Sequence, residues 1–139
     1  MSLASEITSL LTQLDRDFYP AVSSRVVIPV YAEKLARDAM IFSVHDKGRM
    51  VAFIAVYCND MDSRSAFTPM VAVAGEYRSN GVASSLIETA VRYVRKRGFK
   101  SFKLDVHNTN MKAIAMYQRL GFGVIGEKGD SLVMEKIIA

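Results

Sequence analysis

Two stretches of the sequence combine residue types and spacing that could bind a phosphate-bearing substrate and stabilise a leaving group. In the first, the apolar run Met70–Val73 predicts a buried strand, residues 75–81 predict a loop, and a helix is expected from Val82. Backbone N–H groups and the positive end of the helix dipole attract anions at such a junction, and Gly81 lets a ligand approach the backbone closely. The stretch therefore predicts a phosphate-binding loop, to which Arg78 adds a positive charge.

The second stretch, residues 110–122, predicts a short helix with a tyrosine on its buried face. Thr109 or Asn110 can cap its first turn, Tyr117 follows at helical spacing, and Gly121 ends the pattern. A tyrosine hydroxyl can donate a hydrogen bond or a proton to a leaving group. Spacing alone would favour a core aromatic at Tyr117.

Together the two stretches resemble the signatures of the GNAT superfamily of acyl-CoA N-acyltransferases. Residues 78–83, Arg-Ser-Asn-Gly-Val-Ala, fit the pattern Arg/Gln-x-x-Gly-x-Gly/Ala with which this superfamily binds the pyrophosphate of coenzyme A. Residues 110–122 are similar to its second hallmark, Asn-x-x-Ala-x-x-x-Tyr-x-x-x-Gly-Phe. The two motifs occur in the expected order with a helix and a strand between them, and the resemblance covers residues 40–125.

The resemblance implies roles for residues in and before both motifs. Acetyl-CoA would be the co-substrate, with its pyrophosphate bound by Arg78, Ser79, Asn80, Gly81, Val82 and Ala83. Backbone atoms of Val71 and Val73 would pair with the pantetheine arm in a gap between splayed strands, and Asn110 would hydrogen-bond the same arm. Tyr117 would protonate the departing coenzyme A thiolate.

A general base for the attacking amine is expected on the strand that precedes the second motif. Asp105 lies twelve residues before Tyr117, where many members of the superfamily carry a glutamate that accepts the amine proton through water. A carboxylate in an apolar strand must face solvent or a cleft, or be paired, because burying a lone charge is costly. Aspartate reaches one methylene less far than glutamate, so Glu76 and His107 remain alternatives.

Three further patterns do not predict sites. Residues 121–126 match Gly-x-Gly-x-x-Gly, but they follow a helix and lead into a strand, the reverse of the order that dinucleotide binding requires. Asp60 and Asp62 lack the ligand number and spacing of a calcium loop, so no metal is expected. The single cysteine, Cys58, has no Cys or His partner at metal spacing and is expected to pack in a strand.

Periodicity along the chain predicts two helices followed by the order β-β-β-α-β-α-β-β. Pro69 lacks the N–H group of a ladder donor, so it predicts an edge, a bulge or a local opening of strand pairing. The fold class expected is α/β (an α+β mixed sheet), a GNAT-like acyl-CoA N-acyltransferase fold with a central mixed β-sheet flanked by helices. Helices are expected over 3–16, 29–39, 82–97 and 110–120, and strands over 39–44, 50–57, 68–73, 99–106, 122–125 and 132–137.

Length and composition narrow the class of protein. The 139 residues fit a single domain, 1–139, and an apolar content of 50% argues against disorder. No run of about 18 uncharged apolar residues is present, so no membrane span is expected, and we expect a cytoplasmic protein. The net charge of +4 could indicate nucleic-acid binding, but helical positions 88, 92, 95 and 96 lie away from the apolar stripe, which predicts a solvated surface.

We therefore expect an acetyl-CoA-dependent N-acetyltransferase that transfers an acetyl group directly to an amine of a small molecule or a peptide. The acceptor pocket is expected to include Phe18, Tyr19, Arg25, Tyr31 and Tyr57. Two alternatives stay open, a non-catalytic acyl-CoA-binding regulatory module and a basic RNA-binding module that uses residues 92–103. No nucleic acid is expected as a partner, and the fold allows a homodimer.

Overall fold

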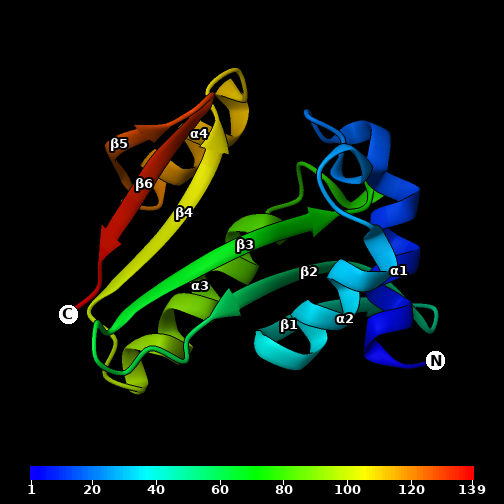
Figure 1. Ribbon diagram of the computed structural model, residues 1–139, viewed down its shortest axis with the longest axis horizontal. Coiled ribbons are helices and arrows are strands. Elements are labelled where there is room, and N and C mark those ends of the chain that lie inside the picture. Colours follow the sequence, from blue (N-terminus) through cyan, green and yellow to red (C-terminus); the bar gives the residue numbers. More distant parts are fainter.

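The computed structural model describes residues 1–139 and contains one mixed six-stranded sheet in the order β1-β2-β3-β4-β6-β5 (Figure 1). Of the paired strands, β3 and β4 run parallel and the others antiparallel. The predicted mixed sheet with flanking helices is confirmed. The helices are α1 (Leu3–Leu14), α2 (Ile28–Asp38), α3 (Val82–Lys96) and α4 (Met111–Arg119). The strands are β1 (Met40–Asp46), β2 (Arg49–Tyr57), β3 (Ser65–Val73), β4 (Ser101–His107), β5 (Gly123–Lys128) and β6 (Ser131–Ile137).

Local sequence signals set the ends of these elements. The Ser2 side chain accepts a hydrogen bond from the N–H of Ser5 and caps α1, which ends at Leu14 and continues as a 3-10 turn over Asp15–Asp17. Lys47 and Gly48 both have positive φ, the geometry of a tight hairpin turn between β1 and β2. Short helical turns also occur at Val22–Ser24 and Gly75–Tyr77, in segments expected to be loops.

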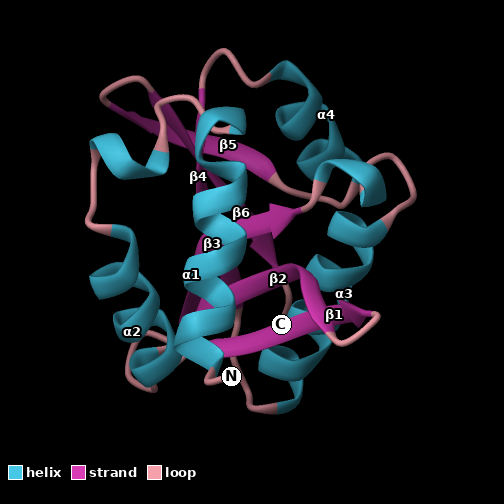
Figure 2. Cartoon of the chain, turned by 90° about the vertical axis from the view of Figure 1, so that its right-hand side faces the viewer, coloured by secondary structure: helices cyan, strands magenta, loops and turns pink.

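The sheet separates two apolar cores, because neighbouring side chains of a strand point to opposite faces. Ile54 and Phe102 pack in the core under α3 and α4, whereas Phe53 packs with Leu11 and Leu35 in the core under α1 and α2. Figure 2 shows the two helix pairs on opposite sides of the strands. Figure 1 shows α1 and α2 over β2 and β3, away from β4, β5 and β6. One face of the C-terminal half of the sheet is therefore not covered by a helix.

The pairing between β3 and β4 stops part-way along both strands. It joins Ser65–Thr68 to residues 101–104 and extends no further, and the two strands then diverge (Figure 1). The register between β2 and β3 also shifts between Ala55 and Tyr57, opposite the same point of β3. Pro69 follows the last paired residue, which confirms the prediction that this proline marks a bulge and an opening in the sheet.

Thr68 stabilises the bulge from inside the protein. Its side chain is buried, and its hydroxyl donates to the carbonyl oxygen of Ala55 at 2.5 Å. Because a buried polar group without a partner is costly, this bond fixes how β3 leaves its regular register. Of all the polar and charged residues in the chain, Thr68 is the only one that is buried.

Replacing Thr68 by valine should therefore destabilise the fold although the two side chains have nearly the same shape. The change leaves the carbonyl of Ala55 without its side-chain donor, and we expect a loss of about 1–3 kcal/mol in the free energy of unfolding. Urea denaturation measures it. Thr12→Val, on the exposed side of α1, is the matched control and should change stability by less than about 0.5 kcal/mol. Equal effects of the two changes would contradict this role.

Candidate active site

The loop before α3 leaves several backbone donors free. Gly81 is the N-cap of α3 with φ 78°, and Ser79, also at positive φ (66°), precedes it by two residues. The first helical bond runs from the N–H of Ser85 to the carbonyl oxygen of Gly81. The N–H groups of residues 82–84 therefore have no partner within the helix and point out of its N-terminus. Such a turn is suited to bind an anion.

Arg78 is folded back from this loop. Its Nε donates to the carbonyl oxygen of Val73 at 2.9 Å, and its Nη2 lies 3.0 Å from Oδ2 of Asp17. The side chains of Arg78 and Asp17 are about half exposed, 45% and 47%. Arg78 therefore joins the end of β3 to the turn after α1, at the border of the loop.

The backbone of Val71 and Val73 is directed toward the opening between β3 and β4. The N–H of Ala74 donates to the carbonyl oxygen of Val51, so in the alternation of an antiparallel pair Ala74 faces β2 and Val73 faces away from it. The pairing with β4 has already ended at this level. An extended ligand could therefore add to this free strand edge, as peptides do in β-augmentation.

Tyr117 lies on α4 with its ring inside the core. It is 9% exposed, and its ring centroid is 5.9 Å from that of Phe122. Burial raises the pKa of Tyr117 to about 12, so its hydroxyl is protonated at neutral pH. No buried side-chain oxygen or nitrogen lacks a hydrogen-bond partner, and the Tyr117 hydroxyl has none within the protein, so that hydroxyl must reach solvent. It is a free donor at the edge of the core.

Asn110 can perform both of its predicted roles. Its Oδ1 accepts from the N–H of Ala113 at 3.3 Å, which makes it the N-cap of α4. Its amide nitrogen makes no hydrogen bond within the protein, and the residue is exposed. The amide N–H groups are therefore available to a ligand.

Asp105 does not lie beside Tyr117. Its neighbours Leu104 and Val106 belong to the core that contains Tyr117, so the carboxylate points to the opposite face of β4. There it lies 3.8 Å from Nζ of Lys128, with 28% of its side chain exposed. The two candidate catalytic groups therefore flank β4 from opposite faces, just beyond the point where β3 diverges.

The two alternative bases differ in where they lie relative to Asp105. Nδ1 of His107 lies 2.7 Å from Oγ1 of Thr109 and 3.2 Å from the backbone nitrogen of the same residue. Glu76 is exposed in the turn Gly75–Tyr77, on the side of the phosphate loop. His107, two residues after Asp105 in β4, therefore shares its face of the sheet, whereas Glu76 lies outside β4.

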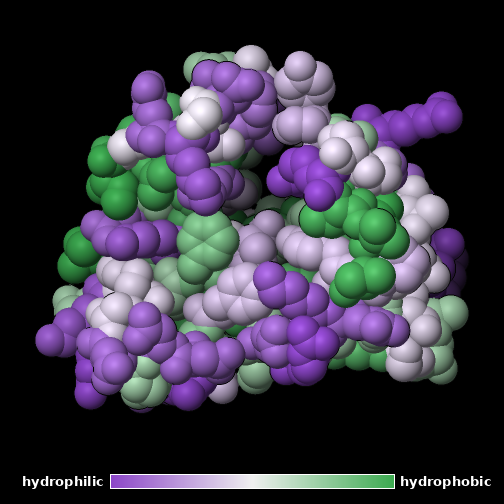
Figure 3. All heavy atoms as spheres, in the orientation of Figure 1, coloured by the Kyte–Doolittle hydropathy of each residue, from purple (hydrophilic) through white to green (hydrophobic).

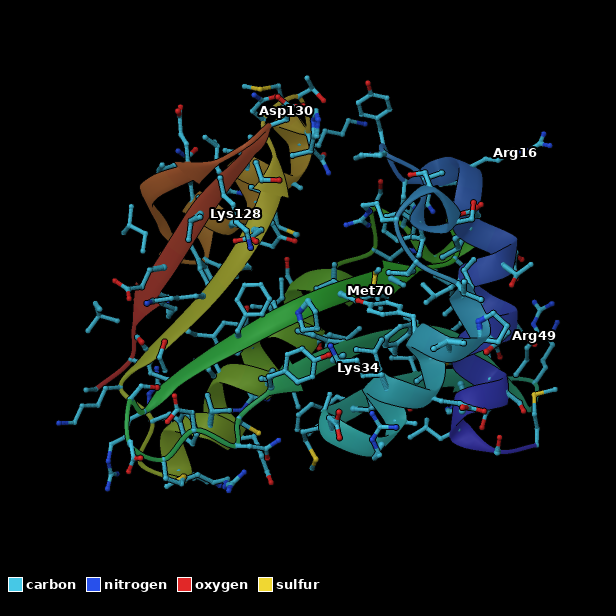
Figure 4. The ribbon with its side chains drawn as sticks, viewed as in Figure 1. Arg16, Lys34, Arg49, Met70, Lys128 and Asp130 are labelled. Atoms are coloured by element: carbon cyan, nitrogen blue, oxygen red, sulfur yellow. The ribbon has the colours of Figure 1, made fainter.

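A recess lies between the two halves of the molecule. Figure 3 shows the surface hollowed in its upper middle, and Figure 4 shows Lys128 and Asp130 on one side of the opening, across from Met70 and Lys34. Tyr19 and His107, the last residue of β4, meet edge to face with their ring centroids 5.0 Å apart. That contact, and the one between Arg78 and Asp17, join segments far apart in the sequence and were not predicted.

Tyr31 and Tyr57, two of the expected pocket residues, lie near each other. Burial, with a smaller contribution from Tyr57, raises the pKa of Tyr31 to about 12. Nζ of Lys34 lies 5.7 Å from the centroid of the Tyr57 ring, a cation–π contact. By contrast, Phe18 is partly buried against the core under α1 and α2.

The basic residues after position 92 do not form one surface. Nε of Arg95 donates to the carbonyl oxygen of Ile138, and Nη1 of Arg97 donates to that of Cys58. These contacts hold the two arginines on different sides of α3. No cluster of His, Cys, Asp or Glu side chains is arranged to hold a metal ion, and no helix is both long and apolar enough to cross a bilayer.

Comparison with known proteins identifies the family. Residues 7–122 match the sequence profile described as the Acetyltransferase (GNAT) family. The chain belongs to this family. Among curated relatives, the [ribosomal protein bS18]-alanine N-acetyltransferase of Escherichia coli is 33% identical over 92 residues, which cover 66% of this chain and 60% of the relative. N-alpha-acetyltransferase MAK3 of Arabidopsis thaliana is 33% identical over 86 residues, covering 60% of this chain and 44% of the relative.

Solved structures of GNAT proteins share the fold. The PaiA N-acetyltransferase of Thermoplasma acidophilum, in complex with coenzyme A, superposes with a TM-score of 0.78 at 17% identity over 99% of this chain and 95% of that one. The ribosomal-protein-S18-alanine N-acetyltransferase of Escherichia coli superposes with a TM-score of 0.75 at 19% identity, over 100% and 91% of the two chains. The resemblance found in the two sequence motifs is thus confirmed.

The geometry of the loop predicts a specific effect of Gly81→Val on coenzyme A binding. A side chain at φ 78° is strained and would stand where a phosphate approaches the backbone, although no protein atom lies within 4 Å of the added Cβ. We expect the dissociation constant for coenzyme A, measured by calorimetry, to rise by about tenfold or more. Gly75→Ala, which also meets open space but has no positive φ, is the control and should bind normally. Unchanged affinity in Gly81→Val would show that the pyrophosphate binds elsewhere.

Proposed function

We propose that this GNAT protein transfers an acetyl group from acetyl-CoA directly to an amine, with both substrates bound at once. The observation that carries the proposal is the free edge of β3 at Val71 and Val73, which ends at a helix N-terminus with unused N–H groups. A long ligand with an amide-bearing arm and a pyrophosphate matches both features. Holding the two substrates in one orientation would supply much of the rate.

In this proposal each motif residue has one task toward acetyl-CoA. The N–H groups of Val82 and Ala83, with the loop residues 79–81, bind the pyrophosphate. Arg78 exchanges the carbonyl of Val73 for a phosphate oxygen, since a charge-assisted bond to phosphate is the stronger interaction. The freed backbone of Val71 and Val73 then pairs with the pantetheine arm. The side-chain amide of Asn110 donates a hydrogen bond to the other side of the arm.

We propose that Tyr117 acts on the sulfur of the leaving group. The amine nitrogen attacks the thioester carbonyl, and the carbon–sulfur bond then breaks with its electron pair on sulfur. A free thiol has a pKa of about 8.5, so full proton transfer from a tyrosine at about 12 would be uphill by about 5 kcal/mol. Tyr117 therefore donates a hydrogen bond that stabilises the thiolate, and the thiolate is protonated afterwards.

Asp105 is our candidate to accept the proton that the amine loses. It lies one residue past the last position of β4 that pairs with β3 and keeps 28% of its side chain exposed, so a water molecule can connect it to the opening. Lys128 would hold the carboxylate in place. An amine on a peptide terminus is one acceptor class to test, because the name of the relative from Escherichia coli specifies an alanine of ribosomal protein bS18.

Two finer predictions belong to the same proposal. The first is a cytoplasmic location, with which the single Cys58 is compatible because it is buried and forms no disulfide. A homodimer is the second, and light scattering would distinguish it from a 15.4 kDa monomer.

Tyr117→Phe tests the role of the hydroxyl. Removing it should lower kcat by about a hundredfold while the dissociation constant for acetyl-CoA changes little, because the phenyl ring keeps its packing. Release of the free thiol, followed with a panel of amines, measures the rate. Tyr93→Phe, a half-buried tyrosine of α3, is the matched control and should keep full activity. Full activity in Tyr117→Phe would exclude the hydroxyl from the reaction.

As the pH increases, kcat/KM should rise, and ionisation of Tyr117 should not make it fall again. The rate increases as the acceptor amine loses its proton, whereas the raised pKa of Tyr117, about 12, keeps its hydroxyl protonated to at least about pH 10. Circular dichroism at each pH checks that the protein stays folded. A decline centred near pH 10, absent from Tyr117→Phe, would contradict the buried, protonated state of this group.

A further inference from the structure

A second hollow lies between α3 and the C-terminal end of α4, on the side of the sheet away from Asp105. Its volume is about 290 Å³, near the lower end of the range for small-molecule sites. Its walls are apolar and come from Ile87, Val91, Leu120 and Phe122. Its middle, at Val91, lies nine residues into α3, or about 13 Å along the helix from the phosphate loop.

The rim of this hollow carries more positive than negative charge. Arg92, Arg95 and Lys136 face it together with a single acid, Glu88. None of the three cations forms an ion pair with a carboxylate of the protein. Each is positioned instead by a neutral oxygen: Nη2 of Arg92 by Thr89 Oγ1, Nε of Arg95 by the carbonyl of Ile138, and Nζ of Lys136 by the carbonyl of Leu120.

We propose that this hollow binds a small organic carboxylate with an apolar tail. The tail would cover the side chains of Ile87, Val91 and Leu120, and the carboxylate would take the N–H groups that Arg92 and Arg95 leave unused. Charge-assisted bonds to guanidinium groups are among the stronger polar contacts, and the surplus of cations disfavours a positively charged ligand. An uncharged ligand of the same shape would leave the rim without a counter-charge.

The hollow is separate from the loop before α3 but adjacent to α4, the helix that carries Tyr117. Phe122 lines the hollow and also stacks near Tyr117, with centroids 5.9 Å apart. Nζ of Lys136, on its rim, donates to the carbonyl oxygen of Leu120, the C-cap of α4. The inference rests on these contacts alone and does not depend on acetyl transfer.

Sodium octanoate is a suitable probe, with octanol and octylammonium as matched probes of neutral and positive charge. We expect octanoate to shift the methyl NMR signals of Ile87, Val91 and Leu120, with or without saturating coenzyme A, and to leave those of Leu11 in the opposite core unchanged. Octanol should bind more weakly and octylammonium more weakly still. No shift at these methyls at millimolar octanoate, equal binding of all three probes, or displacement by coenzyme A would each overturn the proposal.

Two charge reversals on the same helix complete the test. Arg92→Glu should weaken octanoate binding by about tenfold, because it replaces an attractive charge on the rim by a repulsive one. Lys96→Glu, which is exposed on α3 but does not line the hollow, makes the same change of net charge and should have little effect. Equal weakening by both variants would mean that only overall charge matters. Both variants should bind coenzyme A normally, so a failure of this site is distinguishable from a failure of the proposed function.

Discussion

The parallel pairing of β3 with β4 ends at Thr68 and Leu104, and the candidate cofactor-binding and catalytic groups lie beyond that point. Pro69 removes a ladder donor there, while the bond from Thr68 to the carbonyl of Ala55 keeps the bulge attached to β2. The strands can then diverge without unfolding, because each half of the sheet retains its own packing. Ile54 and Phe102 tie the two halves together under α3 and α4.

An opened sheet edge carries a cost, since its backbone groups lose their partners. In the free protein Arg78 offsets part of this cost by bonding the carbonyl of Val73 and pairing with Asp17. Both side chains are about half exposed, so the ion pair contributes at most about 1 kcal/mol. In the proposed function, the residue that satisfies the strand edge would also supply a charge to the pyrophosphate. The proposal therefore couples pyrophosphate binding to release of the strand edge through Arg78.

Local patterns in the sequence predicted most of the fold and the positions of the two motifs. The cap at Asn110, the end of α4 before Gly121 and the opening at Pro69 each depend on a few neighbouring residues, so they could be predicted. The contacts of Arg78 with Asp17 and of Tyr19 with His107 could not, because they join segments that only the folded chain brings together. Which face of β4 carries Asp105 follows from alternation, but its ion pair with Lys128 depends on the path of the β5–β6 hairpin. For this reason the sequence predicts the phosphate loop better than it predicts which residue acts as the base.

Calorimetric titration of the purified protein with acetyl-CoA tests the central claim most directly, with desulfo-CoA and ATP as comparison ligands. The free edge of β3 and the loop before α3 predict saturable binding of acetyl-CoA and of desulfo-CoA, both of which have the pantetheine arm and the pyrophosphate. ATP has phosphates but no arm, and it should bind far more weakly. Absence of acetyl-CoA binding at millimolar concentration, or binding of ATP with equal affinity, would contradict the account.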